Sequence, residues 1–276
     1  MAIEFQTFPT EQQAGDALYN ELRRSLGENP EYHAAENGTE LAARTAIAPH
    51  VVMLAGGSTP LTIYRRIAAE PPRHVHPATH LMLSDDRYVA ATDERSNYGH
   101  IRPLAHALGL PEDRLVHVNP DLPLPEAVHD FGTRIGEVGR RGGIFSLAVL
   151  GIGSDGHTAS LFAPELVEDL AGGPGGAGAA NGSAPGESPL PGNGSLLTED
   201  PARLALHTGE HGGVDRVSVG SAVLLSFRML IFFATGHSKR DILYELSRRP
   251  EHYPAGRIML QHPNATIWTD EAPRVR

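Results

Sequence analysis

The stretch FSLAVLGIGSDGHTASLF, residues Phe145–Phe162, carries the strongest indication of the fold. It begins with Phe145–Leu150, which are apolar apart from one serine and are of the types that favour a buried strand. A polar turn follows, made of Gly151, Gly153 and Gly156 with Ser154, Asp155 and His157 between them. Thr158 is placed to cap a short helix over Ala159–Phe162. A buried strand that ends in such a turn is typical of the ligand-binding edge of an open α/β sheet, and the alternative is a tight turn without a ligand.

Strands and helices alternate outward from this stretch. The sequence predicts further strands at Ile3–Phe8, Val51–Leu54, His80–Leu83, Leu115–Val118, Arg203–His207, Val214–Val219, Met229–Ala234 and Ala265–Thr269. It predicts helices at Thr10–Leu26, Pro60–Ala69, Ser96–Leu108, Pro125–Arg140, Gly220–Ser226 and Ser238–Arg248, with Pro60 as the first residue of its helix. The expected fold is therefore α/β, with a doubly wound, mostly parallel sheet and helices on both faces.

The 276 residues fit a single domain, residues 1–276, with two insertions. Glu28–Pro49 is polar and irregular, and we interpret it as a surface insertion with a helical piece near Leu41–Ile47. A second segment, at about 171–195, is rich in Gly, Pro and Ala and contains no aromatic or β-branched residue. Such a composition cannot bury enough apolar surface to offset its ordering entropy. We expect a loop here, either a lid over the neighbouring site or a disordered segment without a role.

Composition excludes several classes of function. The net charge of -10 argues against a nucleic-acid-binding surface, which needs a basic face. The absence of cysteine excludes disulfides, thiolate metal sites and a cysteine nucleophile. No signal peptide or membrane-spanning run is visible, so we expect a soluble cytoplasmic protein, a monomer or small homo-oligomer. No metal site is predicted, because no H-x-x-x-H spacing accompanies the polar turn.

An anion site is predicted at Gly56-Gly57-Ser58-Thr59, which lies between a buried strand and a helix. Glycines there let backbone N–H groups approach a phosphate, and the positive end of the helix points to the same place, although a plain tight turn gives the same pattern. Lys239 is the only lysine beside 22 arginines and stands at the start of another helix, where a cation opposes the helix dipole unless an anion is bound. Arg216 lies inside an apolar strand and requires an anionic partner, a ligand or an internal carboxylate.

Candidate catalytic residues follow two of the predicted strands. Asp85, Asp86 and Arg87 stand at the carboxyl end of His80–Leu83, which fits a cleft, although a solvated loop is an alternative for each. His157 has a side chain that titrates near neutrality, as a general base requires, and Asp155 is placed to orient it directly or through Arg87. Ser160 lacks the G-x-S-x-G frame of a nucleophile, so we expect His157 to act on water.

Together these motifs resemble the 6-phosphogluconolactonase family. The resemblance rests on LAGGSTP (Leu54–Pro60), SDDRYV (Ser84–Val89), RSNYG (Arg95–Gly99), GIGSDGHTASLF (Gly151–Phe162), DRVSV (Asp215–Val219) and TGHSK (Thr235–Lys239). It implies the fold of sugar-phosphate isomerases and glucosamine-phosphate deaminases. It also implies hydrolysis of 6-phosphogluconolactone to 6-phosphogluconate in the oxidative pentose phosphate pathway, without metal or redox cofactor.

The resemblance also implies roles for individual residues. His157 would be the general base, with Asp155 and Arg87 holding it and the developing charge. Ser58, Thr59, Arg216 and Lys239 would hold the phosphate, and Gly56, Gly57 and Asp85 complete the predicted substrate-binding site. Two positions depart from the family pattern. Asp86 replaces a glutamate, and His211-Gly212-Gly213 replaces a proline-containing segment, for which we expect a looser loop.

Two alternative functions are weighed. An amino-sugar-phosphate deaminase or isomerase on the same fold resembles this turn but has a glutamate five residues after the histidine, where this chain has Phe162. A non-catalytic sugar-phosphate sensor would need a DNA-binding domain, and only 50 residues precede the first glycine-turn strand. Lactone hydrolysis is the favoured function.

Overall fold

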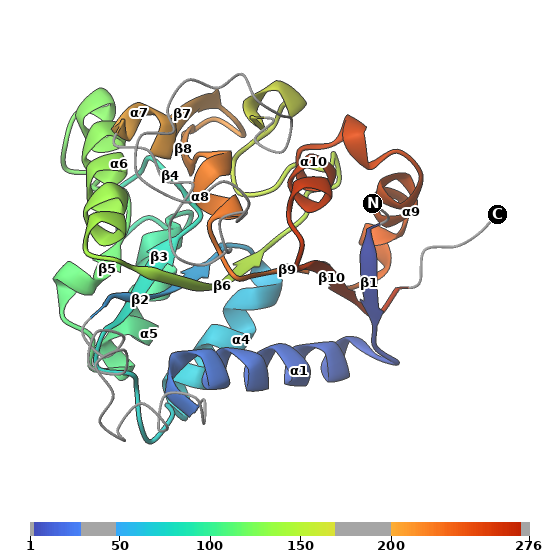
Figure 1. Ribbon diagram of the computed structural model, residues 1–276, viewed down its shortest axis with the longest axis horizontal. Helices are drawn as coiled ribbons and strands as arrows, with labels where there is room; N and C mark the ends of the chain where they lie inside the picture. The colour runs from blue at the N-terminus through green and yellow to red at the C-terminus, as the bar shows by residue number, and fades with distance from the viewer. Residues whose placement is uncertain (1–2, 29–47, 169–199, 272–276) are drawn as a thin grey trace, which may run out of the picture.

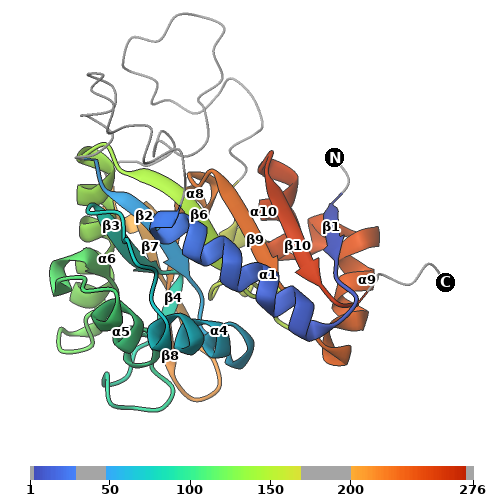
Figure 2. The same ribbon diagram turned by 90° about the horizontal axis from the view of Figure 1, so that it is seen from below.

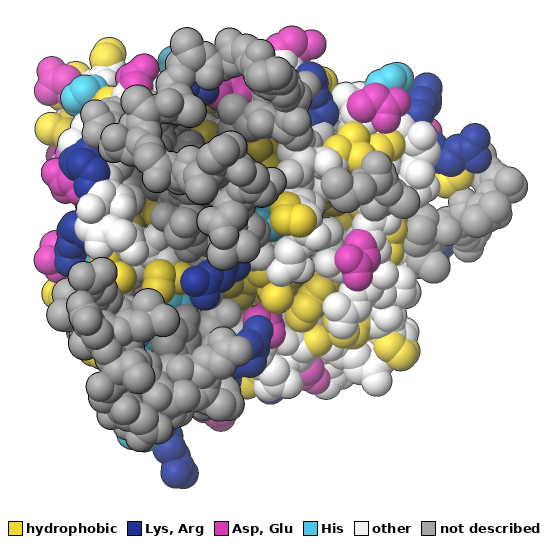
Figure 3. Space-filling view, in the orientation of Figure 1, with side chains coloured by type: hydrophobic (Ala, Val, Ile, Leu, Met, Phe, Trp, Pro, Cys, Tyr) yellow, Lys and Arg dark blue, Asp and Glu magenta, His cyan; other side chains and the backbone are white. Residues whose placement is uncertain are grey.

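The computed structural model describes residues 3–28, 48–168 and 200–271. Most of the predicted surface insertion Glu28–Pro49, including its helical piece, lies outside these residues, and so does the predicted loop at about 171–195. None of the described helices is long and apolar enough to cross a membrane. On the face seen in Figure 3, charged side chains of both signs are scattered between the grey regions.

The main sheet has seven parallel strands in the order β1-β10-β9-β6-β2-β3-β5, which confirms the predicted fold class. Its strands are β1 (Glu4–Thr7), β2 (His50–Leu54), β3 (Thr79–Leu83), β5 (Leu115–Val116), β6 (Ile144–Leu150), β9 (Met229–Phe233) and β10 (Ala265–Thr269). Every residue of β2 and β3 is buried, as expected for central parallel strands rich in Val, Leu and Met. The direction of winding reverses between β2 and β6.

Helices cover both faces of this sheet and bury a core on each side (Figure 1). One face carries α1 (Glu11–Arg23), α4 (Ser58–Ala69) and α5 (Asn97–Ala107). The other carries α6 (Leu124–Arg140), α8 (Ser221–Leu225), α9 (Arg240–Arg248) and α10 (Pro254–Gln261). The view in Figure 2 shows α1 lying across the sheet. Two of the predicted helix starts carry caps, since the hydroxyls of Thr10 and Ser96 accept from the N–H groups of Gln13 and Gly99.

A second sheet of three antiparallel strands, in the order β4-β8-β7, was not expected. It consists of β4 (Asp85–Arg87), β7 (Ala205–Glu210) and β8 (Asp215–Val219), and the short helix α7 (Pro201–Leu204) precedes β7. We expected Asp85–Arg87 to be a polar segment at the end of β3, but it pairs with β8. Asp85 and Asp86 are consequently buried, which rules out a solvated loop.

Two local predictions are wrong. Helix α4 begins at Ser58, so Pro60 is its third residue and Ser58 and Thr59 belong to its first turn. Residues Ala159–Phe162 form no helix: Thr158 pairs with Leu161 in an isolated β-bridge, and Ala159 has a φ of 49°. The remaining short elements are η1 (Arg24–Glu28), η3 (Glu112–Arg114), η4 (Pro164–Leu166), η5 (His237–Lys239) and η6 (Pro250–His252).

Candidate active site

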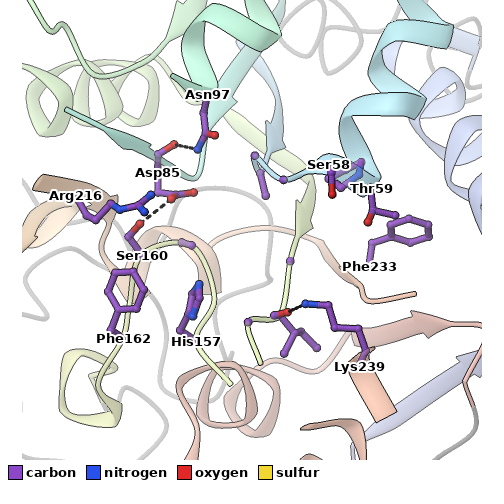
Figure 4. Close-up of a pocket in the computed structure, with 18 of the residues that line it drawn as sticks. Ser58, Thr59, Asp85, Asn97, His157, Ser160, Phe162, Arg216, Phe233 and Lys239 are labelled. Carbon is purple, nitrogen blue, oxygen red and sulfur yellow. Dashed lines mark hydrogen bonds between the residues drawn. The ribbon is translucent and has the colours of Figure 1, made fainter. Parts of the chain in front are cut away.

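A cavity of about 440 Å³ lies at the carboxyl ends of β2, β3, β6 and β9 and is lined by residues of both sheets. It includes the point between β2 and β6 where the winding reverses, which is where open α/β sheets bind ligands. Figure 4 shows polar side chains reaching into this space from opposite walls, with Ser58 and Thr59 on one side and Asp85 and Arg216 on the other.

The first wall is the start of helix α4. Gly57 precedes the helix with a φ of 107°, a conformation that favours glycine, and no side chain caps the first N–H groups. The hydroxyls of Ser58 and Thr59 lie beside these uncapped groups and line the cavity. Free N–H groups, hydroxyls and the positive end of the helix dipole together suit an anion of phosphate size.

Lys239 reaches the cavity from the turn that follows β9. Its Nζ donates a hydrogen bond to the carbonyl of Ile152 at 2.6 Å, which brings the ammonium group over the end of β6 (Figure 4). Burial lowers the pKa of this lysine, against the opposing effect of the nearby charge of Asp155. Among the ion pairs of the described residues none involves Lys239, so its charge is available to a ligand.

Two arginines enter from the second sheet, directly opposite each other in the register of β4 and β8. Arg87 donates to the carbonyl of Arg95 at 2.6 Å, and its buried Nε has no partner within the described chain. Arg216 donates to the carbonyl of His211 at 3.2 and 3.1 Å. Burial, and after it the charge of Arg87, lowers the pKa of Arg216. Like charges opposite each other on paired strands are unfavourable, and the charges of Asp85 and Asp86 offset this effect on Arg216 only in part. The arrangement suits an anion.

Asp85 forms the link between the second sheet and the polar turn. Its carboxylate accepts from the hydroxyls of Ser84 and Ser160, each at 2.7 Å, and its carbonyl accepts from Nδ2 of Asn97 at 3.0 Å. The backbone N–H of Ser160 in turn donates to Ser218 at 3.2 Å. These bonds connect β4, β8 and the turn after β6 beneath the cavity.

His157 and Asp155 form a hydrogen-bonded pair at the end of β6. Nδ1 of His157 lies 2.5 Å from Oδ1 of Asp155, and the same oxygen accepts the backbone N–H of His157 at 3.2 Å. Desolvation raises the pKa of Asp155, but the interactions with His157 together outweigh it, so this pKa lies below its ordinary value. An ionised Asp155 accepts a hydrogen bond from the protonated Nδ1, and the neutral tautomer with Nδ1–H has an unprotonated Nε2.

An aromatic wall backs this histidine. The ring of Phe162 lies 4.6 Å from the ring of His157, and its other neighbour is the ring of His211, stacked at 3.5 Å and 18°. Gly153 is required at this point, since a Cβ there would lie 2.2 Å from Nδ1 of His157 and 2.5 Å from Oδ1 of Asp155.

The structure brings nearly all predicted site residues together. Those lining the cavity are Gly56, Gly57, Ser58, Thr59, Asp85, Arg87, His157, Arg216 and Lys239, and Asp155 joins them through His157. Arg87 does not hold His157 in this structure, because no hydrogen bond or ion pair joins the two in the described chain. Sequence reasoning missed Asn97 and considered Ser160 only as a nucleophile, although both stand within the quoted motifs RSNYG and GIGSDGHTASLF.

Asp86, which departs from the family pattern, is not part of the cavity lining. Its carboxylate accepts the backbone N–H groups of Arg87, Asn97 and Tyr98 at 2.8, 2.7 and 2.9 Å and so anchors the start of α5. Burial raises the pKa of Asp86 to about 7, although the three hydrogen bonds act in the opposite direction. Within the described residues, no group of three or more His, Asp or Glu side chains is arranged to hold a metal ion.

Known proteins match this chain over most of its length. The model of the family described as glucosamine-6-phosphate isomerases/6-phosphogluconolactonase matches residues 30–169. The 6-phosphogluconolactonase of Caulobacter vibrioides is 30% identical over 218 residues, which cover 77% of this chain and 81% of that protein. The human 6-phosphogluconolactonase is 28% identical over 231 residues, with 79% and 77% covered. A solved structure of 6-phosphogluconolactonase from Plasmodium vivax superposes with a TM-score of 0.70 at 20% identity, covering 98% of this chain and 90% of that one. The chain therefore belongs to the glucosamine-6-phosphate isomerase/6-phosphogluconolactonase family.

Proposed function

We propose that this protein hydrolyses 6-phospho-D-glucono-1,5-lactone to 6-phospho-D-gluconate, with His157 as the general base. The observation that carries the proposal is the His157–Asp155 pair, held by a 2.5 Å hydrogen bond in a cavity that also contains an anion site. Relatives named 6-phosphogluconolactonase support the same reaction.

The phosphate of the substrate binds at the start of α4 in this proposal. The uncapped N–H groups and the hydroxyls of Ser58 and Thr59 provide donors, and Lys239 and Arg216 provide cations from two other walls. Because the phosphate does not react, these contacts serve to place the lactone ring and lower its freedom of motion.

Hydrolysis then proceeds by attack of water on the lactone carbonyl carbon. Nε2 of His157 removes a proton from the water as the new C–O bond forms, and the ionised Asp155 stabilises the imidazolium that results. Arg87 stabilises the negative charge on the former carbonyl oxygen. When the tetrahedral intermediate collapses, the bond to the ring oxygen breaks and His157 returns the proton to that oxygen. The products are a carboxylic acid, which ionises, and a free hydroxyl group.

A deaminase function on this fold is disfavoured by the cavity lining. Its only described carboxylate is that of Asp85, which already accepts two hydroxyl hydrogen bonds. Phe162 occupies the position at which a deaminase would carry a glutamate, and the nearest glutamate, Glu165, is exposed and outside the cavity. The acid–base group for opening an amino sugar is therefore missing from the described site.

Two parallel assays test the proposal, one for hydrolysis of 6-phosphogluconolactone above its spontaneous rate and one for deamination of glucosamine 6-phosphate. We expect activity in the first alone. The variant His157→Ala should fold normally and lose at least ~10²-fold in kcat, the usual contribution of a general base. His106→Ala, which removes an exposed histidine from α5, is the matched control and should hydrolyse at the wild-type rate. Normal turnover by His157→Ala would refute the mechanism.

A further inference from the structure

The turn between β7 and β8 brings His211 to the active site. Its two following residues, Gly212 and Gly213, have φ values of 64° and 76°, which two-residue hairpin turns of this handedness require. The N–H of His211 donates to the carbonyl of Val214 at 2.9 Å and closes the turn. The expected looser loop is therefore wrong: the departure from the family pattern produces a tight turn with an aromatic residue at its base.

The ring of His211 completes a row of three rings in contact, in which the His211–Phe162 pair is stacked and the Phe162–His157 pair is tilted at 46°. It lies parallel to the ring of Phe162 at a centroid distance of 3.5 Å, and Phe162 contacts the ring of His157 at 4.6 Å. The hydrogen bond to Asp155 fixes only the Nδ1 side of the His157 ring and still allows the ring to tilt about that bond. The face of Phe162 limits this tilt, and Phe162 is only half-buried, so His211 supplies packing that fixes Phe162 itself.

The backbone of His211 acts on a different residue. Its carbonyl accepts from Nε and Nη2 of Arg216, the cation that enters the cavity from β8. One residue therefore supports both the ring of the general base and a cation of the anion site. The two contacts use separate atoms, the imidazole ring and the main-chain oxygen, so mutagenesis can separate them.

We propose that His211 is a positioning residue for lactone hydrolysis: its ring, through Phe162, holds the ring of His157 in the orientation in which Nε2 removes a proton from the attacking water. This inference rests on the function proposed above. Removal of the ring leaves the carbonyl in place, so Arg216 keeps its partner and substrate binding is preserved. The loss is confined to the chemical step, because a small misplacement of a reacting group is costly to the rate.

The test compares three variants by steady-state kinetics. His211→Ala should lower kcat about 10-fold with KM within twofold of wild type, and His211→Phe should restore kcat to within threefold, because phenylalanine keeps the stack. His207→Ala is the matched control: it removes a histidine from the same hairpin, where His207 pairs with the exposed Asp215 at 2.8 Å, and should behave as wild type.

Other outcomes overturn the inference. Wild-type kcat in His211→Ala, a loss of kcat that phenylalanine fails to restore, or a rise in KM at constant kcat would each show that the stack does not position His157. An equal loss in His207→Ala would assign the effect to the hairpin as a whole.

A measurement without substrate separates this inference from the proposed function. The Cε1–H resonance of His157, identified by its absence in His157→Asn, senses the ring current of Phe162 and should shift in His211→Ala but not in His207→Ala. A wild-type protein without lactonase activity would refute the proposed function and leave this test intact. An unchanged resonance in His211→Ala would refute the positioning role even in an active enzyme.

Discussion

The variant Gly153→Ala tests whether hydrolysis requires the orientation of the His157 ring, because it adds a single carbon atom beside that ring. A Cβ at this position would lie 2.2 Å from Nδ1 of His157, 2.3 Å from its Cε1 and 2.5 Å from Oδ1 of Asp155. Non-bonded contacts of this kind are normally longer than about 3 Å, so the ring must move by roughly 1 Å and the hydrogen bond to Asp155 is broken. A misplacement of that size costs ~10²-fold in rate. We therefore expect kcat to fall about 100-fold, with KM within threefold of wild type.

The fold should tolerate this substitution. Gly153 is not among the described glycines with positive φ, so alanine adopts the same backbone conformation. The side chain of His157 is 29% exposed and can turn toward solvent without leaving a buried void. We expect the free energy of unfolding to stay within ~1 kcal/mol of wild type, since replacing glycine restricts the unfolded chain.

Gly151→Ala provides the matched control for this prediction. Gly151 lines the same cavity two residues earlier, has no positive φ, and a Cβ there would have no atom within 4 Å. Kinetics on 6-phosphogluconolactone and urea denaturation of both variants complete the experiment. The reasoning is refuted if Gly153→Ala keeps more than a third of the wild-type kcat, or if Gly151→Ala loses as much activity as Gly153→Ala.

Three further predictions concern binding and stability. Lys239→Ala should raise KM at least ~10-fold for the phosphorylated lactone and less than twofold for unphosphorylated gluconolactone, because only the phosphate loses a charged partner; equal effects would remove Lys239 from the phosphate site. Ser160→Ala leaves a buried oxygen of Asp85 without its donor and should cost ~1–3 kcal/mol in urea denaturation, and an unchanged midpoint would contradict this. Burial lowers the pKa of His50 to about 4 in the folded protein. As the pH falls, the His50 side chain is therefore protonated in the unfolded chain before it is protonated in the folded one, which favours unfolding. Wild type should therefore lose about 3 kcal/mol between pH 6.5 and 4 that His50→Gln does not lose, and parallel stability curves would refute the assignment.

Features that depend on neighbours in the sequence could be predicted. The caps at Thr10 and Ser96 satisfy N–H groups three residues away, so their signal is local. The central parallel strands are buried on both faces and are therefore continuous apolar runs, which identified the main sheet. The glycine-rich turns after β2 and β6 also predicted two walls of the cavity, because the ligand-binding edge of such a sheet needs glycine directly after a strand.

Features that depend on distant segments could not be predicted. Asp85–Arg87 becomes a strand only because β8 pairs with it, and nothing near Asp85 in the sequence indicates that partner. Ala159 has a positive φ without being glycine, since the surrounding contacts hold it there. The sequence analysis predicts no helix at α10; in the structure a Cβ at Gly256 would lie 2.1 Å from the carbonyl oxygen of Pro250, so glycine is needed there for close packing between distant residues.

The arginines that face each other across β4 and β8 have a consequence for heat stability. Without a bound anion, the repulsion between Arg87 and Arg216 raises the free energy of the folded state alone, since unfolding separates the two side chains. Phosphate bound at the start of α4 and against Arg216 offsets that repulsion, so the protein with bound phosphate should melt at a higher temperature than the protein without it, by mass action. Each ~1 kcal/mol gained in this way raises the melting temperature by ~2–4 °C for a chain of this size. The melting temperature of this protein should therefore be higher in a phosphate buffer than in an uncharged one.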